Sequence, residues 1–147
     1  MKRYVRLVLS ASAAMAIAGC SSGGSGSGAG ITIPTPVIAE NFAGTIDVAG
    51  SDFHTFNVTA TGTLNVTLTA AGPPASIFMG VGIGSPTAAT ATAAPSCTLL
   101  ANASVAAPAG TTPQLSGTIA PGSYCVSVFD VGNQTAQITY AVTVSHP

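Results

Sequence analysis

Most of the chain after residue 41 alternates apolar and polar residues with a period of two. The clearest run is 63–69, in which Leu64, Val66 and Leu68 alternate with threonine and asparagine. Such alternation is typical of a β-strand with one buried and one solvated face. The same pattern predicts further strands at 42–48, 53–59, 77–83, 97–101, 114–119, 124–129 and 138–144.

Clusters of glycine, proline, aspartate and serine separate these runs. The strongest turn signal is 120–123 (APGS), because proline presets φ at its position and glycine accepts a positive φ. Residues 31–41 are expected to form an extended lead-in, and 85–95 and 106–113 to form loops. We therefore predict an all-β fold, an antiparallel two-sheet β-sandwich that is jelly-roll-like and has about eight strands.

Two details concern the outer faces of the predicted strands. Gly80, Gly82 and Gly84 share the face opposite the apolar residues of their strand, which indicates a bulge or a close approach of another chain segment. Phe129 shares a face with Cys125 and is expected either to be exposed or to cover a bridge formed by that cysteine.

Residues 1–19 have the organisation of a secretory signal peptide. Three basic residues fall within 1–6, the run 7–18 is apolar and small, and Gly19 precedes Cys20. A transmembrane helix is the alternative, but spanning a bilayer takes about 20 apolar residues, and this shorter run also contains serine.

The segment 17–20 (IAGC) resembles the lipobox of bacterial lipoproteins. In that family the peptide is cut before the cysteine, which then carries acyl chains. The resemblance implies Cys20 as the lipidation site and membrane lipid as its partner; the alternative is an ordinary signal peptide cut after Gly19. Residues 21–30, rich in glycine and serine, would be a flexible tether. By the same resemblance, Ser21 in place of an acidic residue favours the outer membrane.

Charge is nearly absent from the chain after Cys20. This part has no lysine or arginine, and its only acids are Glu40, Asp47, Asp52 and Asp130. Nucleic-acid affinity comes mainly from basic side chains that neutralise phosphates, so we expect no nucleic-acid partner. The recurrent apolar residues argue against disorder, which requires low hydrophobicity as well as few packing residues.

Cys97 and Cys125 are the remaining pair of cysteines, and in an exported protein they are predicted to form a disulfide. A metal site or a catalytic thiol is the alternative, although two thiols without a nearby histidine do not make a zinc site. Closing a loop of about 29 residues stabilises a fold by roughly 3.5 kcal/mol in the chain-entropy model.

The pattern of 42–147 is similar to that of the bacterial pre-peptidase C-terminal domain. The resemblance rests on opening strands at 44–46, 52–58 and 62–68, and on a closing pair at 120–128 and 140–144. It implies a β-sandwich of the kind appended to exported proteins, some members of which bind calcium and collagen.

Two departures from that family concern its acidic residues. Its fourth strand is often preceded by an acid, where this chain has 75–77 (ASI). Its calcium-binding members carry an acidic cluster in the lead-in, where this chain has only Glu40. The fold is therefore better supported by the resemblance than calcium binding is.

Asp47, Asp52 and Asp130 fall at predicted strand ends or turns. Aspartates there commonly accept hydrogen bonds from nearby backbone N–H groups. A calcium site is the alternative, and it needs several oxygen ligands together. No other cofactor is expected.

Neither histidine has an obvious partner along the sequence. His54 is interpreted as a solvated strand residue, and His146 is the second-to-last residue. A Ser-His-Asp set can be drawn from His54 and the aspartates, but the chain lacks a nucleophile-elbow sequence and serine is abundant.

These observations favour a non-enzymatic, lipid-anchored envelope protein whose sandwich is an interaction or structural module with an envelope protein or glycan as partner. The alternative is a polysaccharide- or protein-binding module assisted by calcium, and a third hypothesis is a hydrolase. An exposed aromatic patch or three converging carboxylates would favour the binding module. A serine hydrogen-bonded to His54 would favour the hydrolase.

Overall fold

The structure, a computed structural model, describes residues 35–147, so Cys20 and the tether 21–30 lie outside the described residues. The described residues form eight strands: β1 (Ile38–Ile46), β2 (Ser51–Val58), β3 (Gly62–Gly72), β4 (Phe78–Thr87), β5 (Ser96–Pro108), β6 (Leu115–Ile119), β7 (Gly122–Asp130) and β8 (Ile138–His146). No helix in this range is long and apolar enough to cross a membrane.

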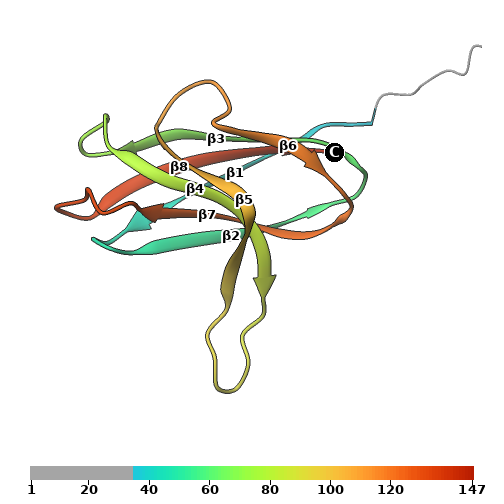
Figure 1. Cartoon of the computed structure of the whole chain (residues 1–147), viewed down its shortest axis with the longest axis horizontal. Coiled ribbons are helices and arrows are strands. Elements are labelled where there is room, and N and C mark those ends of the chain that lie inside the picture. The colour runs from blue at the N-terminus through green and yellow to red at the C-terminus, as the bar shows by residue number, and fades with distance from the viewer. Residues whose placement is uncertain (1–34) are drawn as a thin grey trace, which may run out of the picture. The chain divides into compact units, whose positions relative to one another are not determined.

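The strands form two antiparallel sheets of four (Figure 1). One sheet has the order β1-β8-β3-β6 and the other β2-β7-β4-β5. The first strand therefore pairs with the last, β2 with β7, β3 with β6, and β4 with β5. This nested pairing is the connectivity of a jelly roll, so the predicted all-β sandwich and its jelly-roll character are confirmed.

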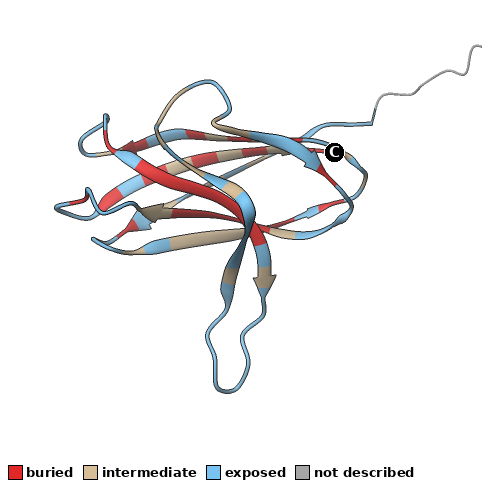
Figure 2. Cartoon of the chain, in the orientation of Figure 1, coloured by how far each residue is buried: buried red, intermediate tan, exposed pale blue. Residues whose placement is uncertain are grey.

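The core lies between the two sheets and is built from alternate residues of each strand. Leu64, Val66 and Leu68 of β3 are at most 6% exposed, whereas the residues between them are more exposed. Facing them across the sandwich are Val126 and Val128 of β7, both buried. Figure 2 shows the buried segments distributed over strands of both sheets. The period-two pattern therefore predicts both the strands and their buried faces.

Strand β4 is buried on both faces, and this explains its row of glycines. A Cβ at Gly80 would collide with the ring of Phe129, and one at Gly84 would lie 2.8 Å from the sulfur of Cys97. Hence no side chain fits without displacement on the outer face of β4 at these positions. The predicted close approach is confirmed, and Phe129 covers Gly80 while remaining half-buried itself.

Strand β5 contains a large bulge opposite β4. Gly82 pairs with Ser104 and Gly84 pairs with Leu99, so a single β4 residue lies opposite residues 100–103. Asn102, within the bulge, has a positive φ of 59°, which asparagine tolerates better than most residues. The bulge predicted from the glycine row therefore exists, with its extra residues on β5.

Three predicted boundaries are wrong. β1 begins at Ile38, inside the expected lead-in, because β8 is long enough to pair Ile38 with His146. β4 continues to Thr87, and β5 continues to Pro108, through residues expected to be loop. In β5 the alternating positions hold alanine and serine, whose similar size hides the periodicity. The exposed loop 88–95 between β4 and β5 projects from the sandwich (Figures 1 and 2).

Candidate functional site

The predicted disulfide between Cys97 and Cys125 is confirmed. It joins β5 to β7, with their Cα atoms 6.0 Å apart, and Cys125 is fully buried. These two strands flank β4 in the sheet. The edge strand β5 is thereby covalently held to the centre of its sheet, with Gly84 of β4 beside the bridge.

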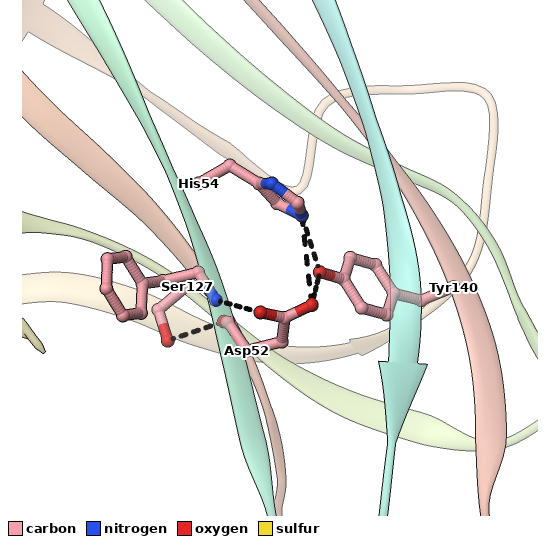
Figure 3. Close-up of polar contacts among 5 residues, drawn as sticks. Asp52, His54, Ser127 and Tyr140 are labelled. Carbon is pink, nitrogen blue, oxygen red and sulfur yellow. Dashed lines mark hydrogen bonds and ion pairs between the residues drawn. The ribbon is translucent and has the colours of Figure 1, made fainter. Parts of the chain in front are cut away.

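Polar side chains from both sheets converge on the side of the sandwich where β1 and β2 are the edge strands (Figure 3). The hydroxyl of Tyr140 on β8 donates to Oδ2 of Asp52 on β2 at 2.7 Å. Nε2 of His54, also on β2, lies 2.8 Å from the same hydroxyl and 3.9 Å from Asp52 Oδ2. Because the single phenolic proton goes to Asp52, His54 is the donor to Tyr140.

The ring of His54 also stacks on Phe42 of β1, with centroids 4.8 Å apart and planes within 8°. His54 was predicted to be solvated and without a partner, and both expectations are wrong. The partners belong to β1 and β8 of the other sheet, more than local sequence could indicate. We call Asp52, His54, Tyr140 and Phe42 the inter-sheet latch.

Tyr140 is the group in the latch whose ionisation is most perturbed. Burial raises the pKa of the phenol above its ordinary value, and the adjacent Asp52 carboxylate raises it further through the hydrogen bond and through charge. Tyr140 is therefore a neutral hydrogen-bond donor over the physiological pH range.

Serine is not the partner of His54 among the described residues. The nearby Ser127 hydroxyl donates instead to the backbone oxygen of Asp52 at 3.3 Å (Figure 3). The contact that would have favoured a hydrolase is thus not formed within residues 35–147.

His146 forms a second link between the sheets, close to the latch in the fold. It is completely buried, its Nε2 lies 2.9 Å from Oε1 of Glu40 on β1, and its Nδ1 lies 3.0 Å from the Pro147 oxygen. Its ring packs against Phe56 of β2, with centroids 5.2 Å apart. Both ring nitrogens face acceptors, so both are placed to donate protons.

Sequence reasoning missed the Glu40–His146 pair and expected no partner for His146, which is wrong. The two residues are 106 positions apart. They meet because the first and last strands are neighbours in the jelly roll, with Glu40 opposite Val144. Knowledge of that pairing was the missing signal.

Asp130 serves the turn that follows β7, as predicted for a strand-end aspartate. Its Oδ1 accepts the backbone N–H groups of residues 132–134, and its Oδ2 accepts that of Ala49 at 2.8 Å. These bonds, that from Ala49 above all, lower the pKa of the Asp130 carboxyl below its ordinary value. The carboxylate thereby ties the β1–β2 turn to the β7–β8 turn.

The other calcium candidates are engaged separately. Asp47 Oδ1 accepts from the side-chain amide of Gln137 at 2.8 Å, and Asp52 is part of the latch. Within residues 35–147, the structure brings no three histidine, cysteine or acidic side chains together as metal ligands. Asp47, Asp52 and Asp130 therefore do not converge as a set of calcium ligands.

A cleft of about 250 Å³ opens on the other side of the sandwich, between the edge strands β5 and β6. Buried Leu64, Ile83 and Ile119 line its interior, while Leu100, which is 42% exposed, and Leu115 lie in its walls. No charged side chain is among the lining residues. Sequence reasoning did not predict this cleft.

Two local features shape the cleft. The β5 bulge carries Leu100 and Asn102 into its lining. On β6, the row that faces inward is Leu115, Gly117 and Ile119, and a Cβ at Gly117 would meet no atom within 4 Å. The glycine therefore leaves open space where a larger residue would fill the gap between the sheets.

The fold and these two regions define the molecule as a jelly-roll β-sandwich with one latched side and one open side. No protein-family model, curated protein or solved structure matches the chain. The resemblance of 42–147 to the pre-peptidase C-terminal domain stays a prediction.

Proposed function

We propose that this chain is an envelope lipoprotein anchored through acylated Cys20, and that its jelly-roll domain is a non-catalytic binding module. The observation that carries the binding role is the open cleft between β5 and β6. Small-molecule and peptide sites are typically concave and mainly apolar, with a few polar groups for orientation. The cleft has this character, with apolar walls and the amide of Asn102.

The anchor is supported by the sequence of 17–20 and by the flexible composition of 21–30. Two or more acyl chains give stable membrane attachment, which a single chain does not. The tether would hold the domain just off the membrane, within reach of other envelope components, and the outer membrane is the favoured location.

Membrane fractionation tests the anchor. Cys20→Ala should move the protein out of the lipid-attached fraction, as judged by alkaline extraction and by loss of metabolic fatty-acid labelling. Ser21→Ala is the matched control and should stay attached. Unchanged attachment and labelling of Cys20→Ala would contradict the anchor.

Affinity capture tests the binding role. Residues 21–147 carrying an N-terminal tag in place of the lipid would be exposed to envelope extract, with calcium or with a chelator, beside an unrelated β-sandwich. Saturable capture of protein in both conditions supports the proposal. Capture lost on chelation would favour the calcium-assisted alternative and direct attention to Asp47, Asp52 and Asp130. No capture above the control would contradict a binding module.

A glycan is the second candidate partner, and the outer face of the β2-β7-β4-β5 sheet favours it. Phe78 on β4 is 49% exposed, and Phe129 on β7 lies two residues along on the same face, over Gly80. Aromatic rings on a flat face offer apolar surfaces for sugar rings. Phe78→Ala should abolish capture if a glycan is the partner and leave it unchanged if the cleft is the binding site.

A further inference from the structure

We propose that the cleft between β5 and β6 binds an extended, uncharged polypeptide segment, which pairs as an additional strand with the outer edge of β6. This inference rests on the proposed binding role and names its partner class. Three independent features lead to it, namely an unprotected strand edge, a missing side chain and the absence of charge.

The outer edge of β6 is available for strand pairing. β6 is hydrogen-bonded to β3 on one side and is the last strand of its sheet on the other. Natural proteins usually protect such edges with charged residues, proline or bulges. β6 (LSGTI) has no charged residue and no proline, and its pairing with β3 is regular. Peptides bind such edges through main-chain hydrogen bonds, with alternate side chains entering pockets.

Gly117 provides space for those alternate side chains. It lies in the middle of the inward row of β6, between Leu115 and Ile119, with no atom within 4 Å of a Cβ built on it. Since side chains of a strand point alternately to its two faces, every second residue of an added strand would point into the cleft. There it would contact buried Leu64 and Ile83.

The distribution of charge selects the chemistry of the segment. Glu40, Asp47, Asp52, Asp130 and both histidines lie on β1, β2, the end of β7, β8 and the β1–β2 turn. None lines the cleft. A charged side chain buried there would lose its hydration without gaining a partner, which is strongly unfavourable. The occupant is therefore uncharged where it enters the cleft.

β6 rather than β5 is the pairing edge. The bulge at 100–103 interrupts the regular spacing of backbone groups on β5, and bulges are a means of blocking edge-to-edge pairing. β5 instead supplies the opposite wall, with Leu100 and the amide of Asn102 in the lining. An acyl chain would match the apolar walls but leave the β6 backbone groups unpaired, so a peptide uses more of the site.

The test uses the full chain reconstituted in lipid nanodiscs and a phage-displayed library of random decapeptides. Peptides are selected on wild-type protein and counter-selected on Gly117→Leu, in which the cleft is filled. One selected peptide is labelled with fluorescein and titrated by anisotropy. Thr55→Leu is the matched control, because Thr55 is exposed on β2, at the opposite edge of the other sheet.

The expected peptides alternate apolar with neutral polar residues. Gly117→Leu should weaken binding by at least about tenfold, and Thr55→Leu should leave it unchanged. N-methylation of alternate peptide bonds should weaken binding as strongly, because it removes main-chain donors without changing side chains. Lysine at an inward peptide position should also weaken it. Circular dichroism confirms that Gly117→Leu is folded, and Gly117→Val replaces it if it is not.

Several outcomes would overturn this inference. They are a selection that yields no peptide, peptides rich in charge, binding insensitive to both cleft variants, or binding insensitive to N-methylation. Self-association of wild-type protein that Gly117→Leu abolishes would identify a second copy as the occupant instead. Envelope capture that survives Gly117→Leu would retain the binding module and reject the cleft as its site. Membrane attachment of Gly117→Leu should be unchanged, so failure of this inference is distinguishable from failure of the anchor.

Discussion

The two sides of the sandwich are closed by different means. Where β1 and β2 form the edges, hydrogen bonds and stacked rings link the sheets through the latch and through the Glu40–His146 pair. Where β5 and β6 form the edges, the sheets are separated by an apolar cleft, and β5 is held to its own sheet by the disulfide.

This difference shows how a chain without basic residues beyond its N-terminal segment divides its tasks. Histidine and tyrosine take the place of lysine and arginine as partners of carboxylates, and nearly all of this polar chemistry lies on one side. That side is satisfied internally, so it offers little to a partner. The other side has apolar surface and an unpaired strand edge, so it is suited to binding.

The largest effect is expected from removing the covalent link on the open side. The double variant Cys97→Ala/Cys125→Ala should lose roughly 3–4 kcal/mol of unfolding free energy, because the reduced unfolded chain gains loop entropy. Urea unfolding followed by circular dichroism measures this. Wild-type protein under reducing conditions should match the variant, and a loss below about 1 kcal/mol would show that β5 is held mainly by its strand pairing.

Removal of the buried histidine should have the next largest effect. His146→Ala should lower the unfolding free energy by about 2–4 kcal/mol, through a cavity and the lost hydrogen bonds. The Glu40 carboxylate is one-third exposed, so it can be rehydrated and adds little to the cost. Ser145→Ala, on the solvent side of β8, is the control and should change stability little.

Two glycines on the edge strands of one sheet give a direct comparison of the sides. A Cβ at Gly44 on β1 would press on Asp52 and on the Tyr140 ring, whereas one at Gly117 on β6 meets nothing. Gly44→Ala should therefore cost about 1–3 kcal/mol, and Gly117→Ala should be neutral or slightly stabilising. Thermal unfolding of the two variants measures the difference, and equal effects would contradict the contrast between the sides.

Tyr140→Phe tests the latch itself, with an expected loss of about 1 kcal/mol at neutral pH. The folded-state pKa of Tyr140 is raised, so its stabilisation is fully present below the ordinary tyrosine value of about 10 and is lost as pH rises through the folded value. The stability difference between wild type and variant should therefore shrink above about pH 10. Urea titrations at several pH values measure it, and a difference constant up to that pH and beyond would contradict the assignment.

Asp130→Asn should have the smallest effect and should appear in acid. The folded-state pKa of Asp130 is lowered, so its contribution is present above the ordinary value of 3.8 and is lost as pH falls through the folded value. The variant should thus be less stable than wild type at neutral pH and converge with it in strong acid. Asp47→Asn, which loses only a side-chain contact to Gln137, is the comparison. Acid-induced unfolding curves that differ equally at all pH values would count against this role.

Some features of the fold were readable from the sequence because they are local. The alternation of Leu64, Val66 and Leu68 predicts a strand and its buried face, and the glycine row of β4 predicts a close approach. The disulfide also followed, since the chain offers only one other cysteine to each of the pair after Cys20. By contrast, β5 was predicted only in part, because alanine and serine alternate without a clear difference in hydrophobicity.

The candidate site was less accessible to sequence reasoning. The Asp52 and Asp130 side chains were identified as candidates, but their partners were not, and His54 and His146 were wrongly left without partners. Each of these contacts joins residues far apart in the chain. Likewise, Gly117 looked like an ordinary strand glycine until its place on an edge beside the β5 bulge was known.

By itself, then, the sequence determined the strand-rich fold class, the buried faces, the near absence of charge and the pairing of Cys97 with Cys125. Only the tertiary structure decided which strands are edges, which side of the sandwich the histidines latch, and where a cleft remains. The physical reason is that a period of two is a property of each segment alone. Strand order depends on long-range hydrogen bonding that brings the first strand beside the last.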